Sequence, residues 1–404
     1  LHFSRGGWEV NVATFLIVLG VWLFLKALEK PKYYLFSVIS LAFSLYVYHA
    51  ARIIVPLLGI GLLVIYWRQI KKHTKTLLVA AALGVVLLFP LVRDFTKEAV
   101  VSRAAGVGLF ADTGPLARIN EQRGEHSDFQ GLSARLLHNK AVNYGLALAQ
   151  NWAEHFWGEF LFLSGDDIQR NKVPETGAFY LTELIFIAIG LLTIAKNSKN
   201  WSPILWWLVV APLAAALTFQ SPHALRAQNM AIPLTVVSAY GLTTVFSWTK
   251  KNRIFLYFVT LIIFWGFARY LHMYYVHMAK EYPFSSQYGV KELVAYVAEN
   301  QDKYQKIWVS DRYDQPYILF LFYSKFSPEK FQSAHSLTAR DRFGFSTVRD
   351  FDKFHFETVN FDKIRPENPN ALIIGTDEEI PAEANIVKKI YGANGHLYFE
   401  VVAN

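Results

Sequence analysis

Eight apolar runs recur in the first two thirds of the chain, and most are separated by short polar connections. They cover residues 10–28, 35–48, 53–67, 77–92, 178–195, 203–219, 230–248 and 254–276. Several are shorter than the ~20 residues that a helix needs to cross the hydrocarbon of a bilayer. The second and third runs are expected to form an antiparallel hairpin, with a buried re-entrant pair as the alternative. The pattern predicts a mostly α, polytopic membrane helical bundle of about eight transmembrane helices.

A different pattern begins near residue 282 and continues to the end of the chain. Residues 289–300 and 316–325 are expected to be helices, whereas shorter apolar stretches are expected to be strands. The expected strands cover residues 306–311, 355–361, 371–376, 386–391 and 396–402, and the last two form a hairpin. Helices alternating with strands predict a small C-terminal α/β domain with its own core.

The distribution of basic residues predicts which connections face the cytoplasm. The net charge is +8, and Lys and Arg gather in alternate connections. They are Lys26, Lys30, Lys32, Arg68, Lys71, Lys72, Lys75, Lys196, Lys199, Lys250, Lys251 and Arg253. The positive-inside rule makes these connections cytoplasmic, so the long polar loop and the tail are expected outside. The basic balance is then a topology signal, and no nucleic-acid partner is expected.

These expectations divide the chain into four parts. Residues 1–92 and 178–281 are each expected to hold four transmembrane helices. Residues 93–177 are expected to form an extracytoplasmic substrate loop with interfacial helices, and residues 282–404 an extracytoplasmic α/β domain. The chain starts at Leu1 without a signal-peptide pattern and is expected to be a fragment or a processed product. It contains no cysteine, which excludes thiolate nucleophiles and disulfides.

The long polar loop closes on an aromatic stretch followed by charged residues. Trp152, Phe156 and Phe160 recur four residues apart, which predicts a helical face suited to the bilayer interface. Gly165 and Pro174 then break the helix and gather charged side chains in a polar turn. These side chains are Asp166, Asp167, Arg170, Lys172 and Glu175. The carboxylates suit acceptor binding or general-base work, and an Asp-rich turn that caps a helix is the structural alternative.

Four short stretches together resemble a known family. Residues 165–177 have the spacing Gly-Asp-x-x-x-Arg-x-x-x-Pro-x-x-Gly, which resembles bacterial members of the dolichyl-phosphate-mannose-protein mannosyltransferase-like superfamily. Residues 3–11, 48–52 and 222–226 agree with this resemblance. The superfamily comprises GT-C fold glycosyltransferases that use polyprenyl-phosphate sugars and are related to aminoarabinose transferases. The resemblance implies a hexosyltransferase of the bacterial cytoplasmic membrane. Its catalytic acid is expected upstream of Leu1, so the catalytic residue is unassigned.

Three arginines fall at the outer ends of apolar runs. Each of Arg5, Arg52 and Arg226 is either a snorkelling anchor or a ligand for phosphate, whose oxygens match the forked donors of a guanidinium. With a polyprenyl-phosphate donor, the expected phosphate ligands are Arg226, Arg52, His223 and Arg5. The residues expected in the acceptor or substrate loop are Asp166, Asp167, Arg170 and Glu175. The acceptor itself is an extracytoplasmic protein, lipid or glycan.

Two other functions compete with glycosyl transfer. A transporter or flippase of lipid-linked saccharides also combines apolar helices with basic outer residues, but the sequence shows no internal repeat and no midspan carboxylate. A non-catalytic membrane scaffold is the second alternative, because the expected catalytic acid lies outside the chain. No metal site is assigned, since His126, His138 and His155 have no recognisable ligand spacing. A divalent cation is kept as an open alternative.

Overall fold

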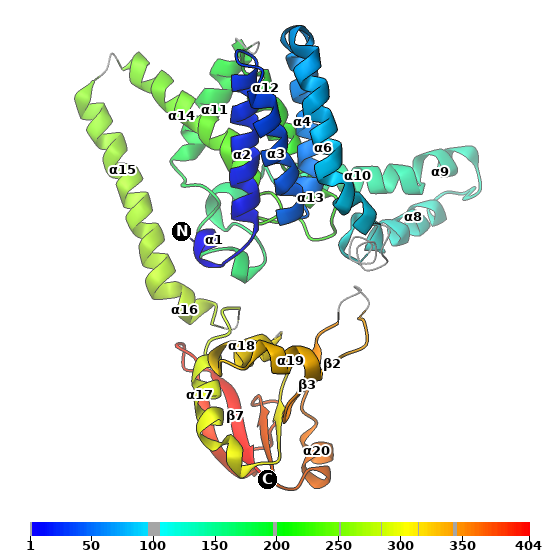
Figure 1. Cartoon of the computed structure of the whole chain (residues 1–404), viewed down its shortest axis with the longest axis vertical. Coiled ribbons are helices and arrows are strands. Elements are labelled where there is room, and N and C mark those ends of the chain that lie inside the picture. The colour runs from blue at the N-terminus through cyan, green and yellow to red at the C-terminus, as the bar shows by residue number, and fades with distance from the viewer. Residues whose placement is uncertain are drawn as a thin grey trace. The chain divides into compact units, whose positions relative to one another are not determined.

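The structure of the protein is a computed structural model. It describes residues 2–95, 106–196, 200–249, 252–283, 285–313, 315–341 and 346–404. The chain divides into two compact units, Leu1–Leu271 and His272–Asn404. The first unit is helical and the second contains a β-sheet (Figure 1).

Apolar helices dominate the first unit, and every predicted apolar run contains one. These helices are α2 (Val10–Ala27), α3 (Tyr33–Val47), α4 (Ala51–Ile65), α6 (Thr74–Asp94), α11 (Glu183–Lys196), α12 (Ser202–Val210), α13 (Leu213–Ala216), α14 (Ala231–Trp248) and α15 (Arg253–His272). Shorter elements beside them are α1 (His2–Arg5), α5 (Trp67–Ile70), η1 (Lys71–His73) and η6 (Gln228–Met230). α2 packs against α3, α3 against α6, and α12 against α4.

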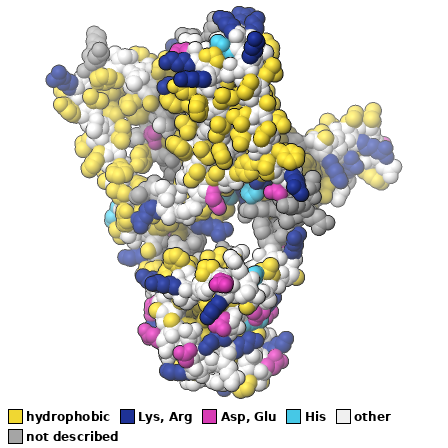
Figure 2. All heavy atoms as spheres, in the orientation of Figure 1, with side chains coloured by type: hydrophobic (Ala, Val, Ile, Leu, Met, Phe, Trp, Pro, Cys, Tyr) yellow, Lys and Arg dark blue, Asp and Glu magenta, His cyan; other side chains and the backbone are white. Residues whose placement is uncertain are grey.

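Four helical segments are long and apolar enough to cross a membrane. They are Val10–Ala27, Trp67–Asp94, Gln228–Trp248 and Arg253–Glu281. The apolar helices Tyr33–Val47, Ala51–Ile65 and Ser202–Ala216 are shorter. Apolar side chains also cover much of the visible outer surface of this unit (Figure 2). These features are typical of a membrane protein, and four of the roughly eight expected spans have the required length among the described residues.

Helices α11 and α14 approach closely because two glycines face the opposite backbone. A Cβ added at Gly241 would lie 1.8 Å from the carbonyl oxygen of Phe186. One added at Gly190 would lie 2.2 Å from the carbonyl oxygen of Val237. Small residues at such a crossing let helix backbones meet where larger side chains would hold them apart.

The long loop of the first unit contains its own helices. They are η2 (Leu109–Ala111), α8 (Gly114–Gly124), α9 (Leu132–Leu137), α10 (Lys140–Glu154), η3 (Glu159–Leu163) and η4 (Gln169–Asn171). The prediction of one aromatic helical face through this region is wrong. α10 ends before Phe156, and Phe160 belongs to the π-helix η3, where it is 4% exposed in the hydrophobic core. The rings of Trp152 and Phe156 lie 4.7 Å apart, but the chain turns before η3, so Phe160 does not continue their face.

The second unit is built on a seven-stranded mixed sheet with the strand order β2-β3-β4-β1-β5-β7-β6. The strands are β1 (Lys306–Val309), β2 (His335–Leu337), β3 (Val348–Phe351), β4 (Phe354–Phe356), β5 (Ala371–Gly375), β6 (Ile386–Tyr391) and β7 (Leu397–Ala403). β1 is parallel to β4 and β5, and the remaining pairs are antiparallel. The predicted C-terminal hairpin is confirmed as the β6–β7 pair.

Helices lie on both faces of this sheet. They are α17 (Val290–Asn300), α18 (Pro316–Tyr323), α19 (Pro328–Ala334) and α20 (Phe361–Glu367). The short helix η8 (Gln301–Lys303) follows α17, whereas η7 (Met273–His277) and α16 (Met278–Glu281) continue α15. Alternate residues of β5 enter two cores. Leu372 and Ile374 belong to the core with α17 and α18, whereas Ile373 belongs to the core with α20. The C-terminal part is therefore an α/β unit, as predicted.

One predicted strand of this unit is partly wrong. β4 ends at Phe356, and Phe361, which was expected to continue the strand, is the first residue of α20. The side chain of Asn360 accepts a hydrogen bond from the amide of Lys363 and so caps the start of that helix. The second half of the predicted strand is therefore irregular backbone that leads into the unrecognised N-cap of a helix.

Candidate functional site

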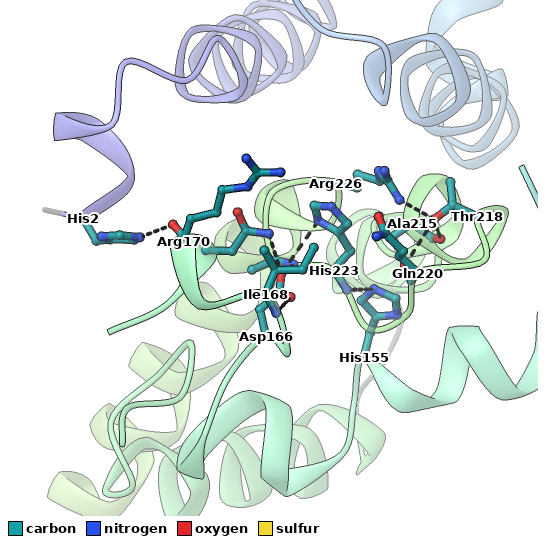
Figure 3. Close-up of polar contacts among 12 residues, drawn as sticks. His2, His155, Asp166, Ile168, Arg170, Ala215, Thr218, Gln220, His223 and Arg226 are labelled. Carbon is teal, nitrogen blue, oxygen red and sulfur yellow. Dashed lines mark hydrogen bonds and ion pairs between the residues drawn. The ribbon is translucent and has the colours of Figure 1, made fainter. Parts of the chain in front are cut away.

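Two segments far apart in the sequence meet in the first unit, and His155 makes the first link between them (Figure 3). His155 is fully buried just after α10. Its Nε2 accepts a hydrogen bond from the backbone amide of His223 at 3.2 Å, and its Nδ1 donates to the carbonyl oxygen of Asn151 at 2.7 Å. This pair of bonds requires a neutral ring with its proton on Nδ1. Burial also lowers the pKa of His155, which favours the same neutral form.

Asp166 makes the second link between the two segments. Its carboxylate is 1% exposed and accepts hydrogen bonds from the amide of Ile168 at 2.8 Å, Asn171 Nδ2 at 3.0 Å and the amide of Ala224 at 2.7 Å. The bond from the amide of Ile168 closes the local turn that the Asp-rich sequence pattern suggested. The bond to Ala224 holds the segment that carries His223. A buried carboxylate is stable here because three N–H donors replace its lost water.

His223 lies between this carboxylate and two arginines. It is 6% exposed, and its Nδ1 is 3.8 Å from Asp166 Oδ2, which is too long for a hydrogen bond. Among the residues that the structure describes, that buried nitrogen has no hydrogen-bond partner. Burial, followed by the positive charge of Arg226, lowers the pKa of His223 to about 3, and Arg170 contributes in the same direction. The ring is therefore neutral at physiological pH.

The guanidinium groups of Arg170 and Arg226 reach the same side of His223 (Figure 3). Arg226 Nη1 donates to Thr218 Oγ1 at 2.7 Å, and that hydroxyl donates to the carbonyl oxygen of Ala215 at 2.6 Å. The hydroxyl is thus oriented as an acceptor for the arginine. The carbonyl oxygen of Arg170 accepts a hydrogen bond from His2 Nε2 at 2.9 Å, and burial lowers the pKa of His2. Two fixed cations beside a neutral imidazole favour the binding of an anion.

The remaining predicted site residues have other surroundings. Arg52, in the first turn of α4, donates from Nε to the carbonyl oxygen of Leu45 and lies 5.4 Å from the centre of the Phe95 ring. Arg5 is exposed in α1, and Asp167 is exposed beside the buried Asp166. Thus four predicted residues share one group, Asp166, Arg170, His223 and Arg226.

Glu175 connects the polar turn to α15. Arg269 donates to both the side chain of Glu175, at 3.1 Å, and its carbonyl oxygen, at 2.9 Å. Glu175 has a positive φ of 49°, which turns the chain sharply before Gly177. A Cβ at Gly177 would lie 2.4 Å from the amide nitrogen of Phe162, so this close return of the loop onto η3 requires glycine.

Sequence reasoning did not assign three residues of this site. His155 was considered only for metal binding, and His2 and Thr218 were not considered. The apolar residues on both sides of His155 are a signal for a buried histidine. Nothing in the local sequence of Thr218 identifies it, because its role depends on the tertiary position of Arg226.

The group favours an anion over a metal ion. Within the described ranges, no three His, Asp or Glu side chains are grouped so that they could hold a metal ion. Both oxygens of Asp166 already accept hydrogen bonds from N–H donors. A divalent cation beside Arg170 and Arg226 would also meet repulsion from two guanidinium groups.

No protein-family model matches this sequence, and no curated protein or solved structure shows significant similarity to it.

Proposed function

We propose that the protein is a membrane glycosyltransferase that uses a polyprenyl-phosphate sugar and transfers the sugar to an extracytoplasmic acceptor. In this proposal the donor phosphate binds at Arg226, Arg170 and His223. Arg170, expected in the acceptor loop, is thereby assigned to the donor. Arg52 and Arg5 are candidates for contacts with other parts of the donor.

The observation that carries the proposal is the meeting of residues 155–171 with residues 218–226. Both segments contribute stretches to the resemblance, residues 165–177 and 222–226, and the two are joined by Asp166 with Ala224 and by His155 with His223. Contacts between motifs that are distant in sequence are expected when both contribute to one site.

The position of the group along the helices supports a site at one membrane surface. Gln228, two residues after Arg226, donates to Asn11 in the first turn of α2. Lys26 lies in the last turn of the same helix. The candidate site and this basic residue therefore lie at opposite ends of α2. The positive-inside rule assigns the end with Lys26 to the cytoplasm and the site to the outer surface.

The chemistry of the group suits a phosphate leaving group. Glycosyl transfer breaks the bond between the sugar C1 and the phosphate oxygen, forms a bond from C1 to the acceptor oxygen, and removes the hydroxyl proton to a base. Negative charge develops on the departing phosphate. Arg170 and Arg226 would stabilise that charge, because donors fixed in advance act most strongly where charge develops. The neutral His223 would supply a hydrogen bond without adding charge.

The direct test uses the complete protein in proteoliposomes with radiolabelled sugars on undecaprenyl phosphate. We expect transfer from one of these donors, and a decrease of about 10²–10³-fold for Arg226→Ala. Arg312→Ala is the control, because Arg312 pairs with the exposed Glu378 in the second unit. Undecaprenyl phosphate binding without transfer from any donor would contradict the enzyme and favour a transporter or a scaffold.

A further inference from the structure

Helices α8, α9 and α10 form an arm that lies crosswise to α6 in the first unit (Figure 1). Apolar side chains line one edge of this arm, and Lys and Arg side chains lie along another (Figure 2). The apolar edge faces the side of the arm from which α6 and α2 extend. The arm thus presents an amphipathic surface at the level where these helices end.

The tip of the arm exposes large apolar side chains. Leu132, Leu136 and Leu137 of α9, and Phe129 just before it, are between 59% and 74% exposed. Leu132 and Leu136 are four residues apart and lie on one side of the helix. On the opposite side Ala134 is fully buried against the rest of the arm. Such a concentration of exposed leucine is unfavourable in water and indicates a surface that is covered.

Helix α10 extends this apolar surface. Val142 and Leu146 are exposed one turn apart, whereas Asn143 and Tyr144 face inward and are buried. Between the acidic residues Asp128 and Glu154, the stretch that carries these apolar side chains contains Arg135 and Lys140 and no carboxylate. Exposed leucines beside two cations are complementary to an anionic bilayer surface.

The arm is attached to the candidate site by specific hydrogen bonds. Asn151 in α10 donates to the carbonyl oxygens of Ala216, at 3.1 Å, and Thr218, at 3.0 Å. Trp152 donates to the carbonyl oxygen of Val209 at 2.8 Å. The side chain of Thr218 in turn accepts the hydrogen bond from Arg226. The arm and the anion-binding group therefore belong to one connected substructure.

We propose that the arm is a membrane-surface anchor that binds anionic lipid. Phe129, Leu132, Leu136 and Leu137 enter the layer between the headgroups and the acyl chains, and Arg135 and Lys140 contact lipid phosphates. Because Asn151 ties α10 to Thr218, the anchor also sets the depth of the candidate site relative to the membrane surface. The anchor does not depend on glycosyl transfer, so a non-catalytic membrane protein would bind lipid in the same way.

The test places a single cysteine in the cysteine-free chain, at Leu136 or at Glu121, and labels it with an environment-sensitive fluorophore. Glu121 is the matched control, because it is exposed on α8 and pairs only with the neighbouring Arg118 among the described residues. The full chain is reconstituted in vesicles of phosphatidylcholine with phosphatidylglycerol. We expect the label at 136 to be quenched by lipids that carry a spin label near the headgroup and to be shielded from iodide. The label at 121 should behave in the opposite way.

The preference for anionic lipid is measured in the same vesicles. Spin-labelled phosphatidylglycerol should quench the label at 136 more than spin-labelled phosphatidylcholine does, with an enrichment of about fivefold per basic residue at low salt. The double variant Arg135→Gln with Lys140→Gln should abolish this difference and retain quenching by total lipid. Equal exposure of positions 136 and 121 to iodide would overturn the anchor. Shielding at 136 without lipid quenching would also overturn it and would indicate a second copy or a protein partner. Equal quenching by the two lipids in the parent would overturn the anionic preference.

Discussion

Asp166 and Ala224 are separated by 58 residues in the chain, and the carboxylate of the first accepts a 2.7 Å hydrogen bond from the backbone amide of the second. This bond joins the polar turn of the long loop to the segment that carries His223 and Arg226. It converts two isolated sequence patterns into one candidate anion site. The energetic consequence is testable at Asp166 without touching either arginine.

Replacement of Asp166 by Asn is expected to destabilise the protein. An amide provides one oxygen and one NH2 group, so at least one of the three N–H groups around Asp166 would lose its acceptor or face another donor. A buried donor without an acceptor costs about 1–3 kcal/mol. Thermal unfolding of the purified protein in lipid nanodiscs should therefore shift to lower temperature.

Asp167→Asn is the matched control for this change, because Asp167 is the adjacent residue and is exposed. It should leave the unfolding temperature nearly unchanged. Equal unfolding temperatures for Asp166→Asn and the parent would show that Asp166 does not hold the two segments together.

The low pKa of His223 predicts a specific dependence of stability on pH. The folded pKa is about 3, whereas an unfolded His has a pKa of about 6.5, so between these values the unfolded chain binds more protons. Stability is therefore fully present above pH 6.5 and is lost as the pH falls toward 3. Between pH 7 and pH 5 the loss from this residue is about 2 kcal/mol.

The measurement compares the parent with His223→Gln over this range of pH. The variant removes the titrating group, so its unfolding temperature should fall less on acidification. His155 and His2 also have lowered pKa values, and they contribute the same pH dependence of stability to both proteins. Parallel curves for the two proteins would contradict the buried, neutral state of His223.

The contact between α11 and α14 predicts a large effect of a single methyl group. Gly241→Ala would place a Cβ 1.8 Å from a backbone oxygen of the facing helix, so the two helices would have to separate. We expect a loss of about 1–3 kcal/mol, as in overpacked cores. Gly59→Ala is the control, since no atom lies within 4 Å of a Cβ at this helical position. Gly59→Ala should be neutral or slightly stabilising. If both variants unfold at the same temperature, the two helices do not meet at Gly241.

In the second unit, Glu379 is expected to stabilise the loops that follow the parallel strands. Its carboxylate accepts from Ser310 Oγ at 3.0 Å, from the amide of Val359 at 2.9 Å and from the amide of Thr376 at 2.9 Å. Glu379→Gln should accelerate amide exchange at Val359 and Thr376, with a loss of about 1–3 kcal/mol. Glu378→Gln, which breaks only an exposed pair with Arg312, should change the same exchange rates little. Equal exchange rates in both variants would refute this role.

The helices were predicted better from the sequence than the site was. Helices depend mainly on local composition, whereas the site depends on contacts between residues that are far apart in the chain. The apolar run at residues 230–248 identified α14 through local composition. In contrast, the pairing of His155 with His223 joins residues 68 positions apart and depends on how helices pack. Local polar signals were also missed. Ser327 caps α19 by accepting from the amide of Lys330, and Asn360 caps α20, yet neither cap was predicted.

The resemblance selected residues from both of the segments that meet at the site. Arg170 was expected in the acceptor loop, and its charge lies close enough to His223 to contribute to the lowered pKa of that ring. Arg52 was ranked with Arg226 from its position at a helix end, yet it bonds to Leu45 and lies near the ring of Phe95. Position along a span therefore indicates depth in the membrane without identifying which side chains share a ligand.

The binding of undecaprenyl phosphate is the direct test of a phosphate site at Arg170 and Arg226. Its affinity is measured for the purified complete protein, for Arg226→Ala, Arg226→Lys and Arg170→Ala, and for the control Arg312→Ala, with undecaprenol as the ligand that lacks phosphate. The parent should bind undecaprenyl phosphate more tightly than undecaprenol. Each alanine variant in the site should bind it at least about tenfold more weakly, Arg226→Lys should be intermediate, and Arg312→Ala should match the parent. Equal affinity of the parent, Arg170→Ala and Arg226→Ala for undecaprenyl phosphate would contradict a phosphate site at these arginines.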